Sequence, residues 1–278
     1  MIPTVRSRTG ARMPVLGQGT WMMGEKARRR ADEVAALRLG FDLGLTLVDT
    51  AEMYAGGGAE EIVGEAIAGR RDEIFVVSKV LPQNSSRTGT IRACEGSLGR
   101  LRTDRIDLYL LHWKGSHPPA GTLEAFQRLR AEGKIRHYGV SNFDPGEMER
   151  AERLPGGPDI AANQILYHLG ERGPERRLIP WCVERGIVVM AYSPLAQGRL
   201  GSKAALEKVA RRHGCGPERV ALAWTIRHEG VVAIPMSSNP DHVRDNAAAT
   251  TLGLTGEDLA DLDAAFPAPE QDVPLGMA

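Results

Sequence analysis

Short apolar runs alternate with helix-like stretches along almost the whole chain. Within each run the apolar positions are continuous rather than alternating with polar ones, which is typical of strands buried on both faces of a parallel sheet. Eight strands are predicted at 15–21, 45–49, 74–79, 106–112, 135–142, 159–164, 186–193 and 231–235. Eight buried strands separated by helices are typical of a closed (β/α)8 barrel, so we predict a TIM barrel of the α/β class.

The stretches between the strands carry helix signals. Residues 33–41 repeat apolar side chains at helical spacing, and Asp144 and Thr255 each precede an acidic residue three positions later, as in a capping box. Helices near 203–213 and 217–229 lie between the seventh and eighth strands, one more than a barrel needs, and another follows at 255–265. A hairpin at 5–7 and 12–15 is expected to plug the barrel floor, and residues 1–278 are expected to form one domain.

Polar and aromatic side chains follow the predicted strands at their carboxyl ends. In barrels of this type the active site lies at those ends. The residues there are Thr20, Trp21, Asp49, Lys79, His112, Ser141, Asn142, Gln164, Tyr192, Ser193 and Ser237. Their concentration at the strand ends predicts a site at that end of the barrel.

Four of the residues in this region have the chemistry to move a proton. Tyr54 is the candidate general acid, although an unperturbed phenol has a pKa of about 10. A charged Lys79 nearby is expected to lower the pKa of Tyr54, and Asp49 is expected to keep the amine of Lys79 charged. His112 is expected to hold a carbonyl oxygen by a hydrogen bond.

Composition narrows the cell compartment and the partners. The 278 residues contain 35 Lys and Arg and 35 Asp and Glu, so no overall field favours nucleic acid or an anionic membrane. Cys94, Cys182 and Cys215 are scattered, which is typical of a reducing compartment. The start has no secretory pattern and no run is long enough to cross a bilayer, so we expect a cytoplasmic location without membrane or nucleic-acid partners.

Three segments resemble the tetrad segments of the aldo-keto reductases. They are Asp49 to Tyr54, Ser78 to Val80 and Leu111 to Trp113, and the resemblance extends over nearly the whole chain. It implies an NADPH-dependent enzyme that reduces aldehydes or ketones to alcohols, with Asp49, Tyr54, Lys79 and His112 as the catalytic tetrad. Several segments look most like the bacterial branch that reduces methylglyoxal, which implies small carbonyl substrates and a monomer.

The same resemblance implies where the cofactor lies, although the chain has no Gly-rich dinucleotide fingerprint. Ser141, Asn142 and Gln164 match residues that hold the nicotinamide amide, and Tyr192 matches the aromatic residue that stacks on its ring. Ser193, Leu195 and Gln197 fall where the family holds the pyrophosphate. The remaining expected cofactor residues are Thr20, Trp21, Asp49, Ile234, Met236, Ser237, Ser238, His242, Asp245 and Asn246.

One part of this segment departs from the family pattern. Many members have lysine where Met236 stands and arginine where His242 stands, both of which face the 2′-phosphate of NADP. Arg244 is an uncertain substitute, because two helical positions turn it by roughly 200° from His242. We therefore expect NADP(H) to be the cofactor, with NAD(H) tolerated better than in members that keep both cations.

The expected substrate residues are Trp21, Met53, Tyr54, His112 and Trp113. Aromatic and thioether side chains make an apolar wall for a small carbonyl compound. The loop after Trp113 and the tail after Pro267 are short, which predicts an open, shallow pocket that tolerates various small aldehydes.

Two other functions remain open at this point. Lys79 at a strand end is also a candidate for Schiff-base chemistry of the aldolase type, although its pairing with Asp49 works against it. The chain is alternatively a cofactor-binding regulatory protein that keeps this fold with little turnover. Measured turnover separates the second alternative from the enzyme.

Overall fold

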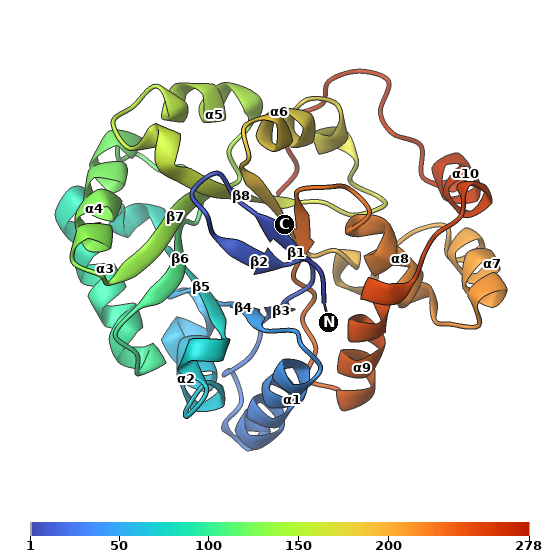
Figure 1. Ribbon diagram of the computed structural model, residues 1–278, viewed down its shortest axis with the longest axis horizontal. Helices are drawn as coiled ribbons and strands as arrows, with labels where there is room; N and C mark the ends of the chain where they lie inside the picture. The colour runs from blue at the N-terminus through green and yellow to red at the C-terminus, as the bar shows by residue number, and fades with distance from the viewer. Residues whose placement is uncertain (1, 278) are drawn as a thin grey trace.

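The computed structural model describes residues 2–277 and shows eight parallel strands curled into a barrel inside a ring of helices (Figure 1). The barrel strands run in chain order from β3 to β10, so each strand pairs with the next one along the sequence. The strands are β1 Thr4–Arg6, β2 Arg12–Pro14, β3 Gln18–Gly19, β4 Leu47–Asp49, β5 Phe75–Val80, β6 Ile106–Leu111, β7 Ile135–Ser141, β8 Ile160–Leu166, β9 Val188–Tyr192 and β10 Val231–Ala233.

The barrel closes between the segment around β3 and the segment around β10. The Gly17 amide donates to the Ala233 carbonyl at 2.9 Å, and the Gly19 amide donates to the Pro235 carbonyl at 2.9 Å. A Cβ atom on Gly19 would lie 2.8 Å from the Ile234 carbonyl oxygen, so this close approach requires glycine. Of the first predicted strand, 15–21, only Gln18–Gly19 form a regular strand. The segment around them contacts the β10 segment through the two closing hydrogen bonds.

The predicted helices are present, with the two capping boxes at Asp144 and Thr255. The helix predicted at 217–229 ends at Thr225, because residues 226–230 turn into β10 and Gly230 has a positive φ of 82°. The helices are α1 Arg30–Asp42, α2 Gly58–Ala66, α3 Arg87–Leu101, α4 Pro119–Ala131, α5 Pro145–Glu152, α6 Leu178–Glu184, α7 Lys203–His213, α8 Pro217–Thr225, α9 Pro240–Ala248 and α10 Gly256–Ala265.

The extra helices are α7 and α10, which pack on each other outside the ring (Figure 1). This confirms the expected additional helix between β9 and β10 and the further one after β10. Within residues 2–277, none of the helices has both the length and the apolar character needed to cross a membrane.

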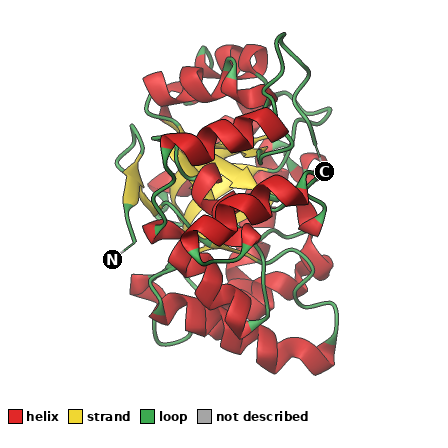
Figure 2. Ribbon diagram, turned by 90° about the vertical axis from the view of Figure 1, so that its right-hand side faces the viewer, coloured by secondary structure: helices red, strands yellow, loops and turns green. Residues whose placement is uncertain are grey.

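The predicted hairpin is formed by β1 and β2, which pair antiparallel with Thr4 opposite Pro14. Its Ala11 and Met13 side chains are buried against the residues that fill the barrel interior. The Arg8 amide donates to the Gly186 carbonyl, just before β9 begins, so the hairpin covers the amino ends of the strands. Figure 2 shows the hairpin at one end of the molecule and the tail after α10 at the other.

The buried side chains form two layers. A large cluster lies between the outer face of the sheet and the helices, and a smaller one fills the barrel beneath the site. The smaller cluster contains Leu47, Val77, Leu108, Leu110, Ala162, Val188, Met190 and Val232, among others. These residues explain the continuous apolar runs, because each strand buries both of its faces.

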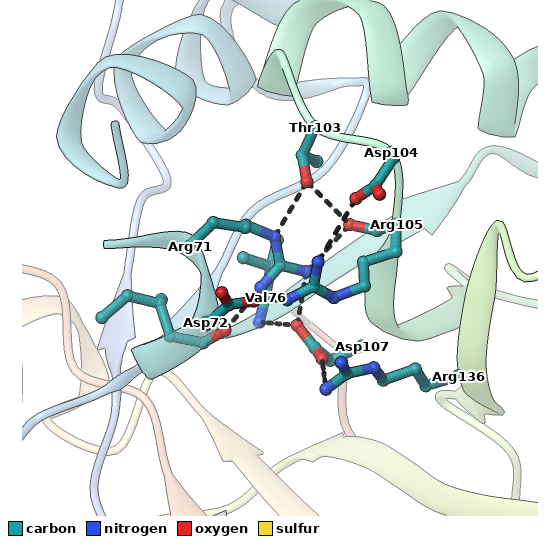
Figure 3. A network of polar contacts seen from close by, with 9 residues as sticks. Arg71, Asp72, Val76, Thr103, Asp104, Arg105, Asp107 and Arg136 are labelled. Atoms are coloured by element: carbon teal, nitrogen blue, oxygen red, sulfur yellow. Dashed lines mark hydrogen bonds and ion pairs between the residues drawn. The ribbon is translucent and has the colours of Figure 1, made fainter. Parts of the chain in front are cut away.

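A polar network joins three strands at the hairpin end (Figure 3). The carboxylate of Asp107 on β6 is 2% exposed and accepts hydrogen bonds from Arg71 at 2.6 Å and from Arg136 on β7 at 3.0 Å. It also accepts from the backbone amide of Val76 on β5 at 3.0 Å. The network thus ties β5, β6 and β7 together at the end of the barrel that is opposite the strand ends with the candidate residues.

We predict that Asp107→Ala lowers the free energy of unfolding by about 1–3 kcal/mol, because the buried amide of Val76 loses its acceptor and the guanidinium groups of Arg71 and Arg136 lose a carboxylate partner. Urea unfolding followed by circular dichroism measures this change. The matched control is Asp104→Ala, whose side chain is 84% exposed and pairs with Arg105. That variant should stay within about 0.5 kcal/mol of the wild type. Equal losses for the two variants would contradict the role assigned to Asp107.

Candidate active site

Four predicted residues meet at the carboxyl ends of β4, β5 and β6. Lys79 is fully buried, and its Nζ atom donates to Asp49 Oδ1 at 2.6 Å and to the Thr50 carbonyl at 2.9 Å. The same atom donates to the hydroxyl of Tyr54 at 3.2 Å. An ammonium has three N–H donors, so these three contacts use all of them. The hydroxyl of Tyr54 acts as the acceptor in this contact, which leaves its own proton free for another partner.

Tyr54 is carried by a turn rather than by a strand. β4 ends at Asp49, and Tyr54 begins the short 3₁₀ helix Tyr54–Gly57. The ring of His112, just after β6, meets the ring of Tyr54 edge-on with 5.8 Å between centroids. Lys79 Nζ lies 4.8 Å from the centroid of the Tyr54 ring. The phenol is therefore held between the ammonium on one side and the imidazole on the other.

A further residue, which the sequence analysis did not identify, fixes this turn. Glu52 Oε1 accepts hydrogen bonds from the Leu81 amide at 2.7 Å and from Asn84 Nδ2 at 3.0 Å. Glu52 lies two positions before Tyr54, and Leu81 lies two positions after Lys79. The carboxylate thus joins the turn that carries the phenol to the segment that carries the amine. Its only sequence signal is an acidic residue inside the turn after β4.

The buried Asp49 and Lys79 perturb each other's titration. Burial acts to lower the pKa of Lys79, but Asp49 and Tyr54 outweigh it, so the pKa of the amine is raised and Lys79 stays protonated at neutral pH. Burial raises the pKa of Asp49, against the pull of Lys79 and of Gln164. A protonated amine that donates three hydrogen bonds has no free electron pair with which to attack a carbonyl carbon, so this geometry disfavours the Schiff-base alternative.

The pKa of Tyr54 moves in the direction opposite to the prediction. Burial raises it above the usual value for a phenol, and the nearby Lys79 offsets only part of that effect. The expectation of a net lowering was therefore wrong, because it did not include the loss of solvent around the ring. A raised pKa keeps the phenol protonated at neutral pH, which is the form that a general acid requires.

His112 is neutral over the physiological pH range. Burial, together with the charge on Lys79, lowers the pKa of His112 to about 2. Its Nδ1 atom is buried and has no hydrogen-bond partner among the described residues. The other nitrogen, Nε2, is the one left to act as a donor toward the cavity that His112 lines. The side chain is thus suited to hold an oxygen atom without being charged itself.

A cavity of about 570 Å³ opens above these four residues. It collects most of the predicted cofactor and substrate residues, namely Thr20, Trp21, Asp49, Met53, Tyr54, His112, Trp113, Asn142, Gln164, Tyr192, Ser193, Leu195, Gln197, Ile234 and Met236. The sequence analysis did not place Gly19, Pro194, Gly198, Pro235 or Met277 in it. Met277 comes from the tail after α10 and lines the cavity. The sequence analysis treated this tail as too short to contribute to the pocket wall.

A chain of hydrogen bonds orders the polar wall of this cavity. Gln164 Nε2 donates to Asp49 Oδ2 at 2.7 Å, so its Oε1 is the atom left for a ligand. Ser141 Oγ, buried behind the wall, donates to the Gln164 carbonyl at 2.8 Å. Asn142 Nδ2 donates to the His112 carbonyl at 3.2 Å, and the hydroxyl of Tyr192 donates to Asn142 Oδ1 at 3.0 Å. These bonds fix the side chains before any ligand arrives.

Backbone strain is concentrated around the cavity. Met22, Asn142, Ser193 and Gln197 line it or follow its strands, and they have positive φ angles of 70°, 60°, 48° and 54°. Ala55, next to Tyr54, has a φ of 50°. Left-handed φ is costly for residues with a side chain and occurs mostly where surrounding structure enforces it. The strain therefore marks the same region as the polar side chains.

The remaining predicted cofactor residues lie beyond the end of the cavity. They are Ser237, Ser238, His242, Asp245 and Asn246. The side chain of Asn239 caps α9 by accepting a hydrogen bond from the Asp241 amide. Asp245 is already paired with Arg219, whose Nε donates to it at 2.9 Å. His242 and Arg244 are both exposed on α9.

Comparison with known proteins gives consistent matches over this length. The chain is 52% identical over 270 residues to methylglyoxal reductase YeaE of Escherichia coli, which covers 95% of each protein. It is 35% identical over 269 residues to glyoxal reductase of Bacillus subtilis, which covers 94% of this chain and 92% of that one. An aldo/keto reductase of Klebsiella pneumoniae, solved with NADP and acetate, superposes with a TM-score of 0.96 at 49% identity, over the full length of both chains.

The family model for the aldo/keto reductases matches residues 15–266, which include the barrel strands and the side chains around the cavity except Met277. Together with the relatives, this match shows that the protein belongs to the aldo/keto reductase family.

Proposed function

We propose that this protein reduces methylglyoxal and related small aldehydes to alcohols, with NADPH as the hydride donor and Tyr54 as the general acid. The observation that carries the proposal is the contact between Lys79 Nζ and the hydroxyl of Tyr54, 3.2 Å long, beside a buried Asp49. It lies at the floor of a cavity that also contains His112. The names of the relatives, a methylglyoxal reductase and a glyoxal reductase, support the substrate class.

The residues of the cavity fit a nicotinamide cofactor. Gln164 Oε1 and the second lone pair of Asn142 Oδ1 offer acceptors for the carboxamide N–H groups, while Tyr192 provides an aromatic wall. Residues 193–198 carry polar and backbone groups along the cavity, where a pyrophosphate would be held. When bound, the reduced nicotinamide supplies a hydride to the carbonyl carbon. The Klebsiella pneumoniae relative solved with NADP supports this choice of cofactor.

The tetrad residues then divide the remaining work. Tyr54 donates its proton to the carbonyl oxygen, and the ammonium of Lys79 stabilises the phenolate that forms. Asp49 keeps that ammonium charged and in position, through the 2.6 Å contact to its Oδ1. His112, as a neutral imidazole, donates a hydrogen bond to the same carbonyl oxygen and so orients it toward the phenol.

The substrate end of the cavity is apolar and partly open. Trp21 and Met53 are 43% and 41% exposed, and the ring of Trp113 lies 4.7 Å from that of His112. A small aldehyde covers part of these surfaces when it binds, which favours compact carbonyl compounds with one apolar side.

We also infer the context in which the enzyme works. Every group assigned here to the reaction comes from one chain, which supports a monomer. Cys94 and Cys182 are buried free thiols, which supports a reducing, cytoplasmic location. The helices pack around one sheet, which supports a single domain over residues 1–278.

We predict that Tyr54→Phe lowers kcat/KM for methylglyoxal with NADPH by about 10²–10⁴-fold, because the proton donor is lost. Loss of reduced cofactor absorbance measures turnover, and fluorescence quenching measures NADPH affinity, which should change less than about 3-fold. The control is Tyr138→Phe, whose hydroxyl donates to the Gly156 carbonyl away from the cavity. Full activity of Tyr54→Phe would refute its role, and a wild type inactive on several aldehydes would favour the regulatory alternative.

We predict that Glu52→Ala lowers kcat by about 10–100-fold while leaving NADPH affinity unchanged, because the turn that carries Tyr54 loses its attachment to the segment after Lys79. Glu52→Gln should stay within about 3-fold of the wild type, since its amide oxygen still accepts both hydrogen bonds. Steady-state kinetics of the two variants distinguishes position from charge. If Glu52→Gln is as slow as Glu52→Ala, the positioning role is wrong.

We predict that the free energy of unfolding decreases as the pH falls below about 6.5, because the buried imidazole of His112 stays unprotonated in the folded protein. The folded-state pKa is about 2 and the unfolded value is 6.5, so in this window only the unfolded chain binds the proton. The free energy of unfolding should fall by about 1.4 kcal/mol per pH unit from this residue alone. Urea unfolding from pH 7.5 to 5 should show a shallower fall for His112→Gln. Parallel profiles would mean that the folded protein protonates His112 normally.

A further inference from the structure

The cavity ends at Met236, and the next two residues along the chain are Ser237 and Ser238. Under the proposed function, this is where the adenosine end of the dinucleotide leaves the cavity. NADP(H) differs from NAD(H) by a 2′-phosphate at that end, and a fixed positive charge is the usual means of binding such a group. Neither Met236 nor His242 has a fixed charge.

An arginine from a distant part of the chain, Arg29, lies next to Ser238 and supplies a fixed positive charge there. Arg29 ends the short 3₁₀ helix Ala27–Arg29 before α1, and its Nη2 donates a hydrogen bond to Ser238 Oγ, 209 residues away in the sequence. The side chain of Arg29 is 49% exposed, so the guanidinium keeps donors that face solvent next to Ser238. The contact joins the start of α1 to the loop between β10 and α9.

The guanidinium is held in this direction by a buried acid. Glu33 Oε1 lies 3.8 Å from Arg29 Nε, one helical turn later on α1. Glu33 is 1% exposed, and its other oxygen accepts a hydrogen bond from the Gly24 amide at 2.9 Å. Gly24 follows Trp21 and Met22, which line the cavity. Arg29 is therefore anchored to the loop after β3, which forms one side of the cavity.

We propose that Arg29 is the residue that binds the 2′-phosphate of NADP(H), with Ser238 Oγ as a second donor, and that it sets the preference over NAD(H). An arginine presents paired N–H donors that match two phosphate oxygens. The charge comes from the 3₁₀ helix before α1, on the β3 side of the barrel closure, and not from the loop or helix that follows β10. This inference rests on the proposed NADPH-dependent function and names the residue that selects the cofactor.

Two other cations provide matched comparisons. Arg28 is the sequence neighbour of Arg29, and Arg244 lies on α9 two positions after His242. The side chains of both make no hydrogen bond or ion pair with residues 2–277. If the local net charge alone attracted the phosphate, all three arginines would contribute similarly. If Arg29 is the specific ligand, only its replacement changes the distinction between the two cofactors.

The test compares binding of adenosine 2′,5′-bisphosphate with that of adenosine 5′-monophosphate, and of NADP⁺ with NAD⁺, by calorimetry. We expect Arg29→Gln to weaken the two 2′-phosphorylated ligands by about 10–100-fold and the other two by less than 2-fold. Arg29→Lys should recover part of the loss, since it keeps the charge. Arg28→Gln and Arg244→Gln should change each affinity by less than about 3-fold, and melting temperatures show that every variant is folded.

Three results would overturn the proposal. Equal weakening by Arg28→Gln and Arg29→Gln would reduce the effect to general charge, and a selective loss in Arg244→Gln would transfer the role to α9. A uniform loss of all four ligands in Arg29→Gln would indicate a structural role. A wild type that binds neither dinucleotide would instead refute the proposed function itself, and so the two failures can be told apart.

Discussion

The buried ion pair between Lys79 and Asp49 is the interaction on which the site depends. Two charges removed from water are costly, and their attraction offsets that cost only when the geometry is good and the remaining donors are satisfied. Lys79 meets this condition with the Thr50 carbonyl and the hydroxyl of Tyr54 as its other partners. The phenol is therefore one of the groups that make the buried ammonium tolerable, as well as the group on which the ammonium acts.

The barrel makes this arrangement possible by aligning the strand ends. β4 and β5 are parallel neighbours with Asp49 opposite Val77, so Lys79 lies two residues further along β5 and on the same face of the sheet as Asp49. Gln164 on β8 reaches across the barrel to the second oxygen of Asp49. Closure at Gly17 and Gly19 brings Met236 next to the same opening. A site drawn from several strands thus follows from the curvature of one sheet.

The sequence predicted the features that depend on local pattern and on resemblance. Strands buried on both faces give continuous apolar runs, and capping boxes such as that of Asp144 lie within four residues. It did not predict features that depend on distant contacts. The meeting of Arg29 with Ser238, the return of Met277 to the cavity and the tie from Glu52 to Leu81 join segments whose spacing carries no signal. The predicted direction of the Tyr54 pKa shift was wrong for the same reason, because the burial that raises this pKa is a property of the whole fold.

The two ends of the barrel differ in a way that bears on how such an enzyme changes over evolution. At the hairpin end, Asp107 and its partners hold the strands with satisfied bonds, so substitutions there cost stability. At the other end, Ser193 and Gln197 hold left-handed backbone conformations that their side chains disfavour. Replacements that relax that backbone release stored strain. Substitutions at Ser193 and Gln197 therefore act on the binding of the cofactor rather than on the stability of the scaffold.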